Sequence, residues 1–371
     1  PAEAIETVSV TTSNYDAEFG RAAGAVTSVT LKSGTNTLKG SAFWFGSNEK
    51  FNSLPASTHF SRRKLAAWKP VYAVSAREHA NEVSSTTHVL QWLRDVLEKE
   101  PAILRDVRVV VNPVWNADGA DLAMDLAEER PDDLLHAGYL GSLGENLTVG
   151  QDDRDPLYTE AKLRLRLFGD HLPDVFFNPH GYPMHEWVQP FSGYAAWVKK
   201  RDPKSRDWWI PRGAFIQSFQ YVDDEAEPAY AAIAEDVRKR LGRAIDADPA
   251  ARALNAEQYA RYERWSRFLP ADLRLPRVEN TVVYGPIRGV ESKKDAVQFV
   301  QRFPKTCLAN VILEVPDETA RGEHLRTVSA AGRAVSSALV QFLRERSAHP
   351  PEKVTPYKDG ALRVRARKRV G

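Results

Sequence analysis

The feature that most constrains the fold is a change of hydrophobic period between residues 68 and 98. Residues 71–74 form a short apolar run that is typical of a buried strand, and residues 84–98 repeat apolar side chains at helical spacing. The predicted apolar side of that helix consists of Val89, Leu90, Leu93 and Leu97. An apolar strand followed directly by an amphipathic helix is the first half of a βαβ unit, so the pattern predicts an α/β fold.

Later segments repeat the same alternation. Further apolar runs predict strands at residues 107–111, 174–177 and 310–315. Helical periodicity covers residues 230–241, 256–268 and 323–346. Since 43% of the residues are hydrophobic, the chain can bury a large core. We therefore predict a mainly parallel mixed sheet flanked by helices.

The first 55 residues differ from the rest. They contain short β-type runs at residues 7–11, 25–31 and 40–45, separated by small polar residues, and no helical pattern. The last 22 residues are basic and lack apolar periodicity. We expect three parts: a β-rich appendage at 1–55, an α/β domain at 56–349, and a basic tail at 350–371.

Composition argues against several classes of function. The 51 Lys and Arg residues nearly balance the 49 Asp and Glu residues and are scattered, so we expect no nucleic-acid partner. No run of about 18 apolar residues exists, so we expect no membrane-spanning helix. Cys307 is the single cysteine, which excludes an intrachain disulfide.

His79 and Glu82 form an HxxE motif between the strand at 71–74 and the following helix. Residues three apart on a first helical turn point the same way, so both side chains can reach one metal ion. A hydrolytic zinc site needs about three such ligands and one open position. The alternative for an isolated HxxE motif is a pair of side chains that faces solvent.

Two residues further along the chain complete the candidate site. His180 follows the strand at 174–177, and the carboxyl ends of parallel strands collect functional groups. Glu314 lies inside an apolar strand, where an ionised carboxylate is costly unless it faces a cation, a donor or a polar cavity. The alternatives are that Glu314 points outward from an edge strand, and that His185 replaces His180 as a ligand.

These elements resemble the carboxypeptidase A-like zinc metallocarboxypeptidases over about residues 65–348. That family has an HxxE motif, an Asn-Pro-Asp-Gly turn, a distant strand-end His, and a catalytic Glu ahead of a long terminal helix. The counterparts in this chain are His79 and Glu82, the Asn-Ala-Asp-Gly segment at 116–119, His180, and Glu314. The resemblance implies one zinc ion held by His79, Glu82 and His180, with Glu314 as general base and a peptide or small amide as substrate.

The chain departs from the family where a substrate carboxylate would bind. No Asn-Arg pair lies between the turn and His180. Arg130 and Arg154 are candidates for binding an oxyanion or a carboxylate, Asn146 could assist, and Tyr284 is a candidate for closing over the substrate. Without the pair, a zinc deacylase or amidohydrolase acting on small amides stays open beside a carboxypeptidase.

The N-terminal segments at 12–21, 23–25 and 30–36 resemble the end of the plug domain of TonB-dependent outer-membrane receptors. Residues 40–45 would then begin a first barrel strand. The chain begins with Pro1 without a signal-like segment, so we expect a fragment or a chimera. Both resemblances imply a periplasmic, outer-membrane-associated or secreted protein. A non-catalytic receptor fragment fused to a damaged peptidase domain is the alternative from another class.

Overall fold

The computed structural model describes residues 5–11, 26–31, 69–131, 139–141, 144, 146–147, 159–183, 212–221, 229–267, 275–283, 308–318, 320–347, 355–356 and 362–363. The chain divides into two compact units, Pro1–Pro55 and Ala56–Gly371. In the first unit, β1 (Ile5–Thr11) pairs antiparallel with β2 (Val26–Leu31). The predicted run at 40–45 lies outside the described residues.

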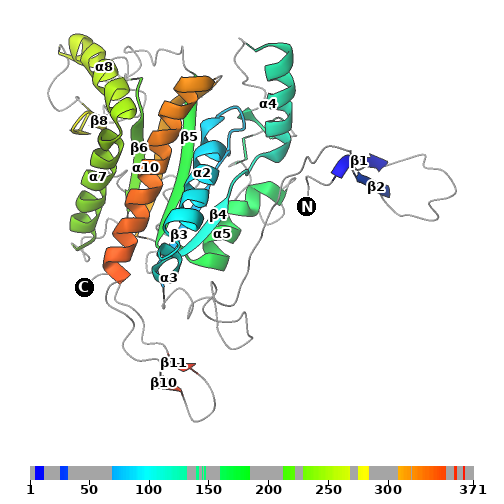
Figure 1. Cartoon of the computed structure of the whole chain (residues 1–371), viewed down its shortest axis with the longest axis horizontal. Coiled ribbons are helices and arrows are strands. Elements are labelled where there is room, and N and C mark those ends of the chain that lie inside the picture. The colour runs from blue at the N-terminus through cyan, green and yellow to red at the C-terminus, as the bar shows by residue number, and fades with distance from the viewer. Residues whose placement is uncertain are drawn as a thin grey trace, which may run out of the picture. The chain divides into compact units, whose positions relative to one another are not determined.

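The second unit is built on a five-stranded sheet with the order β4-β3-β5-β9-β6 (Figure 1). Its strands are β3 (Val71–Ser75), β4 (Arg108–Asn112), β5 (Val175–Pro183), β6 (Phe215–Tyr221) and β9 (Ala309–Glu318). Strands β4, β3, β5 and β9 run parallel, and β6 pairs antiparallel with β9. This confirms the predicted α/β fold with a mixed, mostly parallel sheet flanked by helices.

Helices connect and cover these strands. They are α2 (Ser84–Lys99), α3 (Ile103–Asp106), α4 (Ala117–Glu129), α5 (Leu163–His171), α7 (Ala229–Ala247), α8 (Pro249–Ser266) and α10 (Gly322–Ser347), with the 3-10 helix η4 at Thr159–Lys162. Two-residue strands complete the unit: β7 (Arg277–Val278), β8 (Thr281–Val282), β10 (Thr355–Pro356) and β11 (Leu362–Arg363). In Figure 1, α2, α7 and α10 lie together in front of the sheet.

Side-chain alternation along β5 separates the two faces of the sheet. The ring of Phe177 lies 6.1 Å from that of His88 in α2, centroid to centroid. The ring of Phe176 instead lies 4.8 Å from that of Phe168 in α5. Because alternate residues of a strand share a face, Asn178 and His180 lie with Phe176 on the α5 side. The candidate site is therefore on the face opposite α2 and α10.

Helix α2 has the predicted extent, but its predicted apolar side is partly wrong. Val89, Trp92 and Val96 are buried, whereas Leu90 and Leu97 are 47% and 46% exposed. Residues 89, 92 and 96 follow the three- and four-residue spacing of one helical stripe. Leu90 and Leu97 are seven residues apart on the neighbouring stripe, which faces outward.

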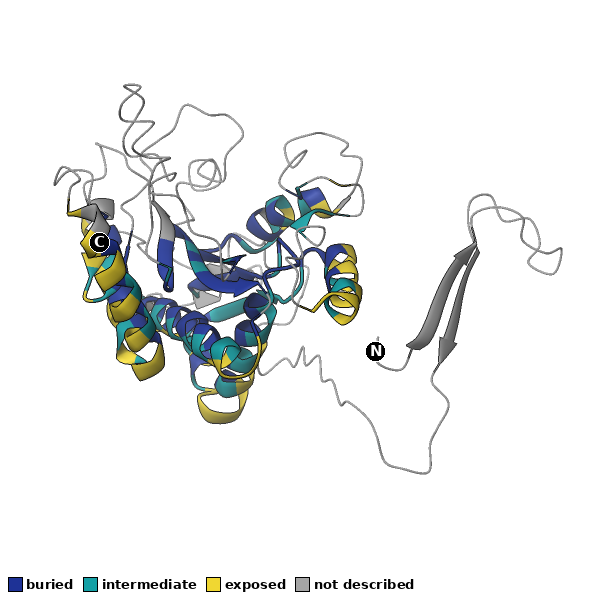
Figure 2. Cartoon of the chain, turned by 90° about the horizontal axis from the view of Figure 1, so that it is seen from above, coloured by how far each residue is buried: buried dark blue, intermediate teal, exposed yellow. Residues whose placement is uncertain are grey.

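Strands β3, β5 and β9 are mostly buried, whereas β4 at the edge of the sheet is intermediate throughout, as Figure 2 shows. All five residues of β3 are buried, since helices cover both faces of the parallel sheet. Among the described helices, none combines the length and the apolar character that crossing a membrane requires.

Candidate metal centre

The loop that carries the HxxE motif is held in place by its backbone. After β3, Arg77 adopts a left-handed conformation with φ of 60°. Its N–H donates to the hydroxyl of Ser85 at 3.1 Å, and its carbonyl accepts from the N–H of Asn116 at 2.9 Å. A conformation that costs about 1–3 kcal/mol persists only where the surroundings fix it, and such residues cluster at functional sites.

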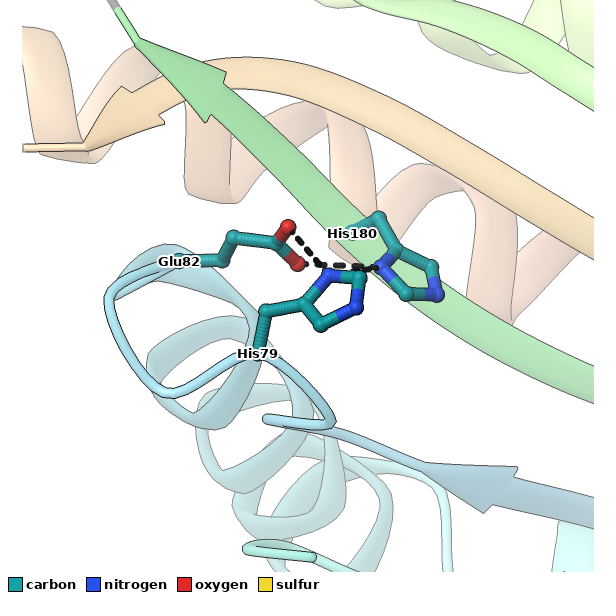
Figure 3. A group of neighbouring side chains, drawn as sticks. All are labelled: His79, Glu82 and His180. Atoms are coloured by element: carbon teal, nitrogen blue, oxygen red, sulfur yellow. Dashed lines mark hydrogen bonds and ion pairs between the residues drawn. The ribbon is translucent and has the colours of Figure 1, made fainter. Parts of the chain in front are cut away.

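Three buried side chains converge over β5. The prediction that His180 follows the end of its strand is wrong, because pairing with β9 extends β5 to Pro183 and His180 lies inside it. His79 Nδ1 lies 2.7 Å from Glu82 Oε1, and His180 Nδ1 lies 3.0 Å from Glu82 Oε2. The two Nδ1 atoms are 3.1 Å apart. In Figure 3 the three side chains point toward one another, two from the loop before α2 and one from β5. The structure thus brings together residues that are 98 to 101 positions apart in sequence.

The donor set fits a zinc ion. Ligand atoms placed about 2.1 Å from a tetrahedral zinc ion lie about 3.4 Å from one another. The two Nδ1 atoms are 3.1 Å apart, and they lie 2.7 and 3.0 Å from different oxygens of Glu82, so a small outward movement admits the ion. Each residue offers a ligand atom within 4.8 Å of the others, and all three are buried. Two imidazoles and one carboxylate also match the ligand chemistry of catalytic zinc.

The electrostatics of the group favour a cation among these ligands. Burial alone would raise the pKa of Glu82, but His79 and His180 outweigh that effect and hold this pKa below its usual value. Burial would lower the pKa of His180, yet the nearby carboxylates of Glu82 and Glu78 raise it well above the usual value. The centre therefore stabilises positive charge, which zinc can supply in place of protons.

Outer hydrogen bonds orient both imidazole rings. His180 Nε2 lies 2.8 Å from Asn178 Nδ2 and 3.3 Å from Glu78 Oε2. His79 Nε2 lies 3.1 Å from Asn146 Nδ2, and the ring of Tyr139 stacks on that of His79 at 3.6 Å. Among these partners the carboxylate of Glu78 is the acceptor, and the second ring nitrogen of a metal-binding histidine commonly donates to such a group.

The sequence analysis missed most of these outer contacts. Asn178 lies two residues before His180, so the period of a strand could have placed it on the same face. Glu78 contacts His180 across 102 residues of sequence, and no spacing rule indicates that contact. Asn146, which the sequence analysis names as a residue that could assist Arg130 or Arg154, lies beside the ring of His79. Its part in binding a substrate stays a prediction.

Glu314 lies next to His180 in the register of β5 and β9. Side chains of residues paired in a sheet project from the same face, so Glu314 shares the face of the candidate metal centre. Its side chain is half-buried, and it lies on an interior strand rather than the edge of the sheet. This register gives Glu314 a place beside the ligands, while its catalytic role stays a prediction.

Gly181 is required by the packing behind His180. A Cβ atom at this position would overlap the carboxylate of Asp317. Asp317 is fully buried and accepts the N–H of Ser84, the first residue of α2, at 2.7 Å. Burial, followed by the negative charge of Glu82, raises the pKa of Asp317 to about 7. The neighbouring Glu318 accepts from Asn81 Nδ2 at 2.5 Å, so the end of β9 fixes the HxxE loop from behind.

The other predicted residues have more varied positions. Arg130 is exposed at the C-terminal end of α4, and its catalytic role stays a prediction. Tyr284, Arg154 and His185 lie outside the described residues. The predicted turn at 116–119 is the start of α4, where the side chain of Asn116 accepts the N–H of Gly119 at 2.9 Å.

Comparison with known proteins gives structural likeness alone. No protein-family model and no curated protein sequence matches the chain. A provisionally named carboxypeptidase A from Shewanella denitrificans has 13% identity and a TM-score of 0.44, and covers 74% of this chain. Metallo-carboxypeptidases from Pseudomonas aeruginosa and Burkholderia cenocepacia have 14% and 16% identity, TM-scores of 0.42 and 0.40, and cover 74% and 75% of this chain.

This chain spans 58% of the length of each of those three structures. Likeness at this identity and score does not identify the chemistry of the chain, which has to follow from the geometry of its own residues. None of the comparisons supports the resemblance of residues 1–50 to a receptor plug.

Proposed function

We propose that the chain is a zinc-dependent hydrolase of peptide or amide bonds, with carboxypeptidase action as its most specific form. The observation that carries the proposal is the convergence of His79 Nδ1, His180 Nδ1 and the carboxylate of Glu82 in a buried group. Three such ligands leave one coordination position open, as catalytic zinc sites do.

Each residue has a defined part in the proposed reaction. A zinc ion held by the three ligands supplies Lewis-acid polarisation of the scissile carbonyl and lowers the pKa of water. Glu314, beside His180 in the sheet register, takes the proton of the attacking water and passes it to the leaving amine. Asn178 and Glu78 hold His180 with its Nδ1 atom toward Glu82.

The substrate is proposed from chemistry rather than from a defined pocket. A peptide fits the resemblance to metallocarboxypeptidases, and Arg130 and Tyr284 keep their proposed roles in binding the oxyanion and covering the substrate. A zinc deacylase acting on small amides is the second candidate, because the sequence has no Asn-Arg pair to bind a terminal carboxylate.

The first experiment measures zinc per chain by elemental analysis of the wild type, His180→Ala and Glu314→Gln. We expect about one zinc ion per chain in the wild type and in Glu314→Gln, and loss of zinc in His180→Ala. The hydrolysis rate of Glu314→Gln should fall about 10²- to 10⁴-fold, as expected when a general base is removed. A folded wild type without zinc would reject the proposal and favour a non-catalytic fragment.

Substrate blocking separates the two candidate activities. Peptides with a free C-terminal carboxylate and the same peptides with a C-terminal amide serve as matched substrates. Loss of single C-terminal residues from the free peptides alone supports a carboxypeptidase. Equal turnover of both, or turnover of small N-acyl amino acids alone, supports the amidohydrolase.

A further inference from the structure

A buried ion pair lies directly behind the candidate metal centre and has no part in the ligand set. Glu78 Oε2 accepts a hydrogen bond from the guanidinium of Arg164 at 2.6 Å. Both side chains are only 2% exposed. Burying two charges costs several kcal/mol per ion before they attract one another, and such a pair is weak evidence for stability. Its presence therefore calls for another role.

The same carboxylate oxygen serves the third ligand. Glu78 Oε2 lies 3.3 Å from His180 Nε2 and accepts from Asn178 Nδ2 at 2.8 Å. The other ring nitrogen of His180 faces Glu82 at 3.0 Å. One ring nitrogen thus points to the metal-binding side, and the other lies 2.8 Å from the amide nitrogen of Asn178 and 3.3 Å from the buried carboxylate of Glu78. A carboxylate in that position fixes the tautomer and orientation of a ligand histidine and makes the ring a better donor.

Arg164 fixes the position of Glu78 from α5. Arg164 itself is held in α5, with its guanidinium 4.9 Å from the centre of the Trp115 ring. The indole N–H of Trp115 donates to the carbonyl of Glu160 at 2.8 Å. Glu78 is thereby held between the guanidinium of Arg164 and the ring of His180.

We propose that Glu78 is a positioning residue that orients His180 for zinc, and that Arg164 acts through Glu78 by holding it in place. This inference rests on the proposed zinc site. It adds to that site the guanidinium of Arg164 in α5, which covers the sheet face that carries His180. The prediction is that zinc affinity depends on residues that never touch the ion.

The test measures the zinc dissociation constant by competition with a chromogenic chelator, and the visible spectrum of the Co²⁺-substituted chain. The main variant is Glu78→Gln combined with Arg164→Met, which removes both charges and leaves neither buried alone. We expect a 10- to 100-fold loss of zinc affinity and an altered Co²⁺ spectrum. Affinity within twofold of the wild type, with an unchanged spectrum, would overturn the inference.

Ser336→Ala is the matched control, because it removes a different buried hydrogen bond, the one at 2.9 Å from the hydroxyl of Tyr72. It should lower the melting temperature and leave the zinc affinity unchanged. An equal loss of zinc affinity in this control would show that the main variant acts through general destabilisation, and would also overturn the inference.

If the variants do not fold, a measurement on the wild type still tests the inference. Nitrogen-15 NMR of the histidine rings, assigned with Asn178→Ala, should show His180 protonated at Nε2 in a hydrogen bond to a carboxylate, with or without zinc. His180 protonated only at Nδ1 would contradict the inference. A wild type that binds no zinc but shows this Nε2 proton would reject the proposed function and keep the orienting contact.

Discussion

His88 provides a quantitative test of how the sheet and its helices pack. It lies in α2 and is 1% exposed, between the ring of Phe177 and the backbone of Gly332 in α10. Burial, reinforced by the positive charge of Arg333, lowers the pKa of His88 to about 3. A histidine in the unfolded chain has a pKa of about 6.5, so the two states bind protons differently between these values.

The sign of the effect follows from proton uptake. Below pH 6.5 the unfolded chain protonates His88 and the folded chain does not, so acid favours unfolding. The contribution of His88 to the free energy of unfolding is complete above pH 6.5 and declines as the pH falls toward about 3. At pH 5, which is 1.5 units below the unfolded pKa, the loss amounts to about 2 kcal/mol.

The assay is urea unfolding of the wild type and His88→Gln at pH 8 and pH 5. The comparison between proteins removes contributions from other titrating groups, because both proteins share them. Relative to the variant, the wild type should lose about 2 kcal/mol of unfolding free energy between the two pH values. Equal pH dependence of the two proteins, within about 0.5 kcal/mol, would refute the assignment of a neutral buried imidazole.

Three further predictions test other parts of the structure. Gly181→Ala should displace Asp317 from the first N–H of α2, which costs about 1–2 kcal/mol and weakens zinc binding; an unchanged melting temperature and zinc affinity would contradict the packing described for this pair. Asn255→Ala should cost about 2–4 kcal/mol in urea unfolding, because the Asn255 side chain bonds both the N–H and the carbonyl of Ala214; its zinc content should stay at the wild-type value, and zinc loss would argue against independence of the two regions. Removal of zinc by a chelator should lower the melting temperature, by an amount equivalent to about 2.7 kcal/mol when free zinc had been at 100 times its dissociation constant; calorimetry that shows no shift would mean that the ion does not bind the folded state.

The sequence predicted those features that depend on local pattern. The strand at 71–74 is apolar on both faces, and that at 310–315 is apolar apart from Asn310 and Glu314. His79 and Glu82 follow the first of these strands at a recognisable spacing. The prediction failed for the outward side of α2, where Leu90 and Leu97 are as apolar as the residues that pack inward. Hydrophobicity alone does not distinguish two adjacent stripes when both carry apolar residues.

The contacts behind the ligands could not be predicted because they depend on strand register. Glu314 lies beside His180 through the pairing of β5 with β9, which sequence separation does not reveal. Nothing in the sequence distinguishes Glu78 from other charged residues, because its ion pair with Arg164 depends on the position of α5 in the fold. The structural role of Asp317 likewise depends on a distant partner, because its carboxylate accepts the N–H of Ser84, 233 residues earlier in the chain.

The same long separations govern when the centre can form during synthesis. The loop with His79 and Glu82 is made first, His180 follows about a hundred residues later, and the β9 carboxylates that hold the loop come 233 to 237 residues after their partners. A chain still emerging from the ribosome therefore has its ligands without the strand that fixes them. The proposed hydrolytic activity therefore requires that β9 has been translated and paired with β5.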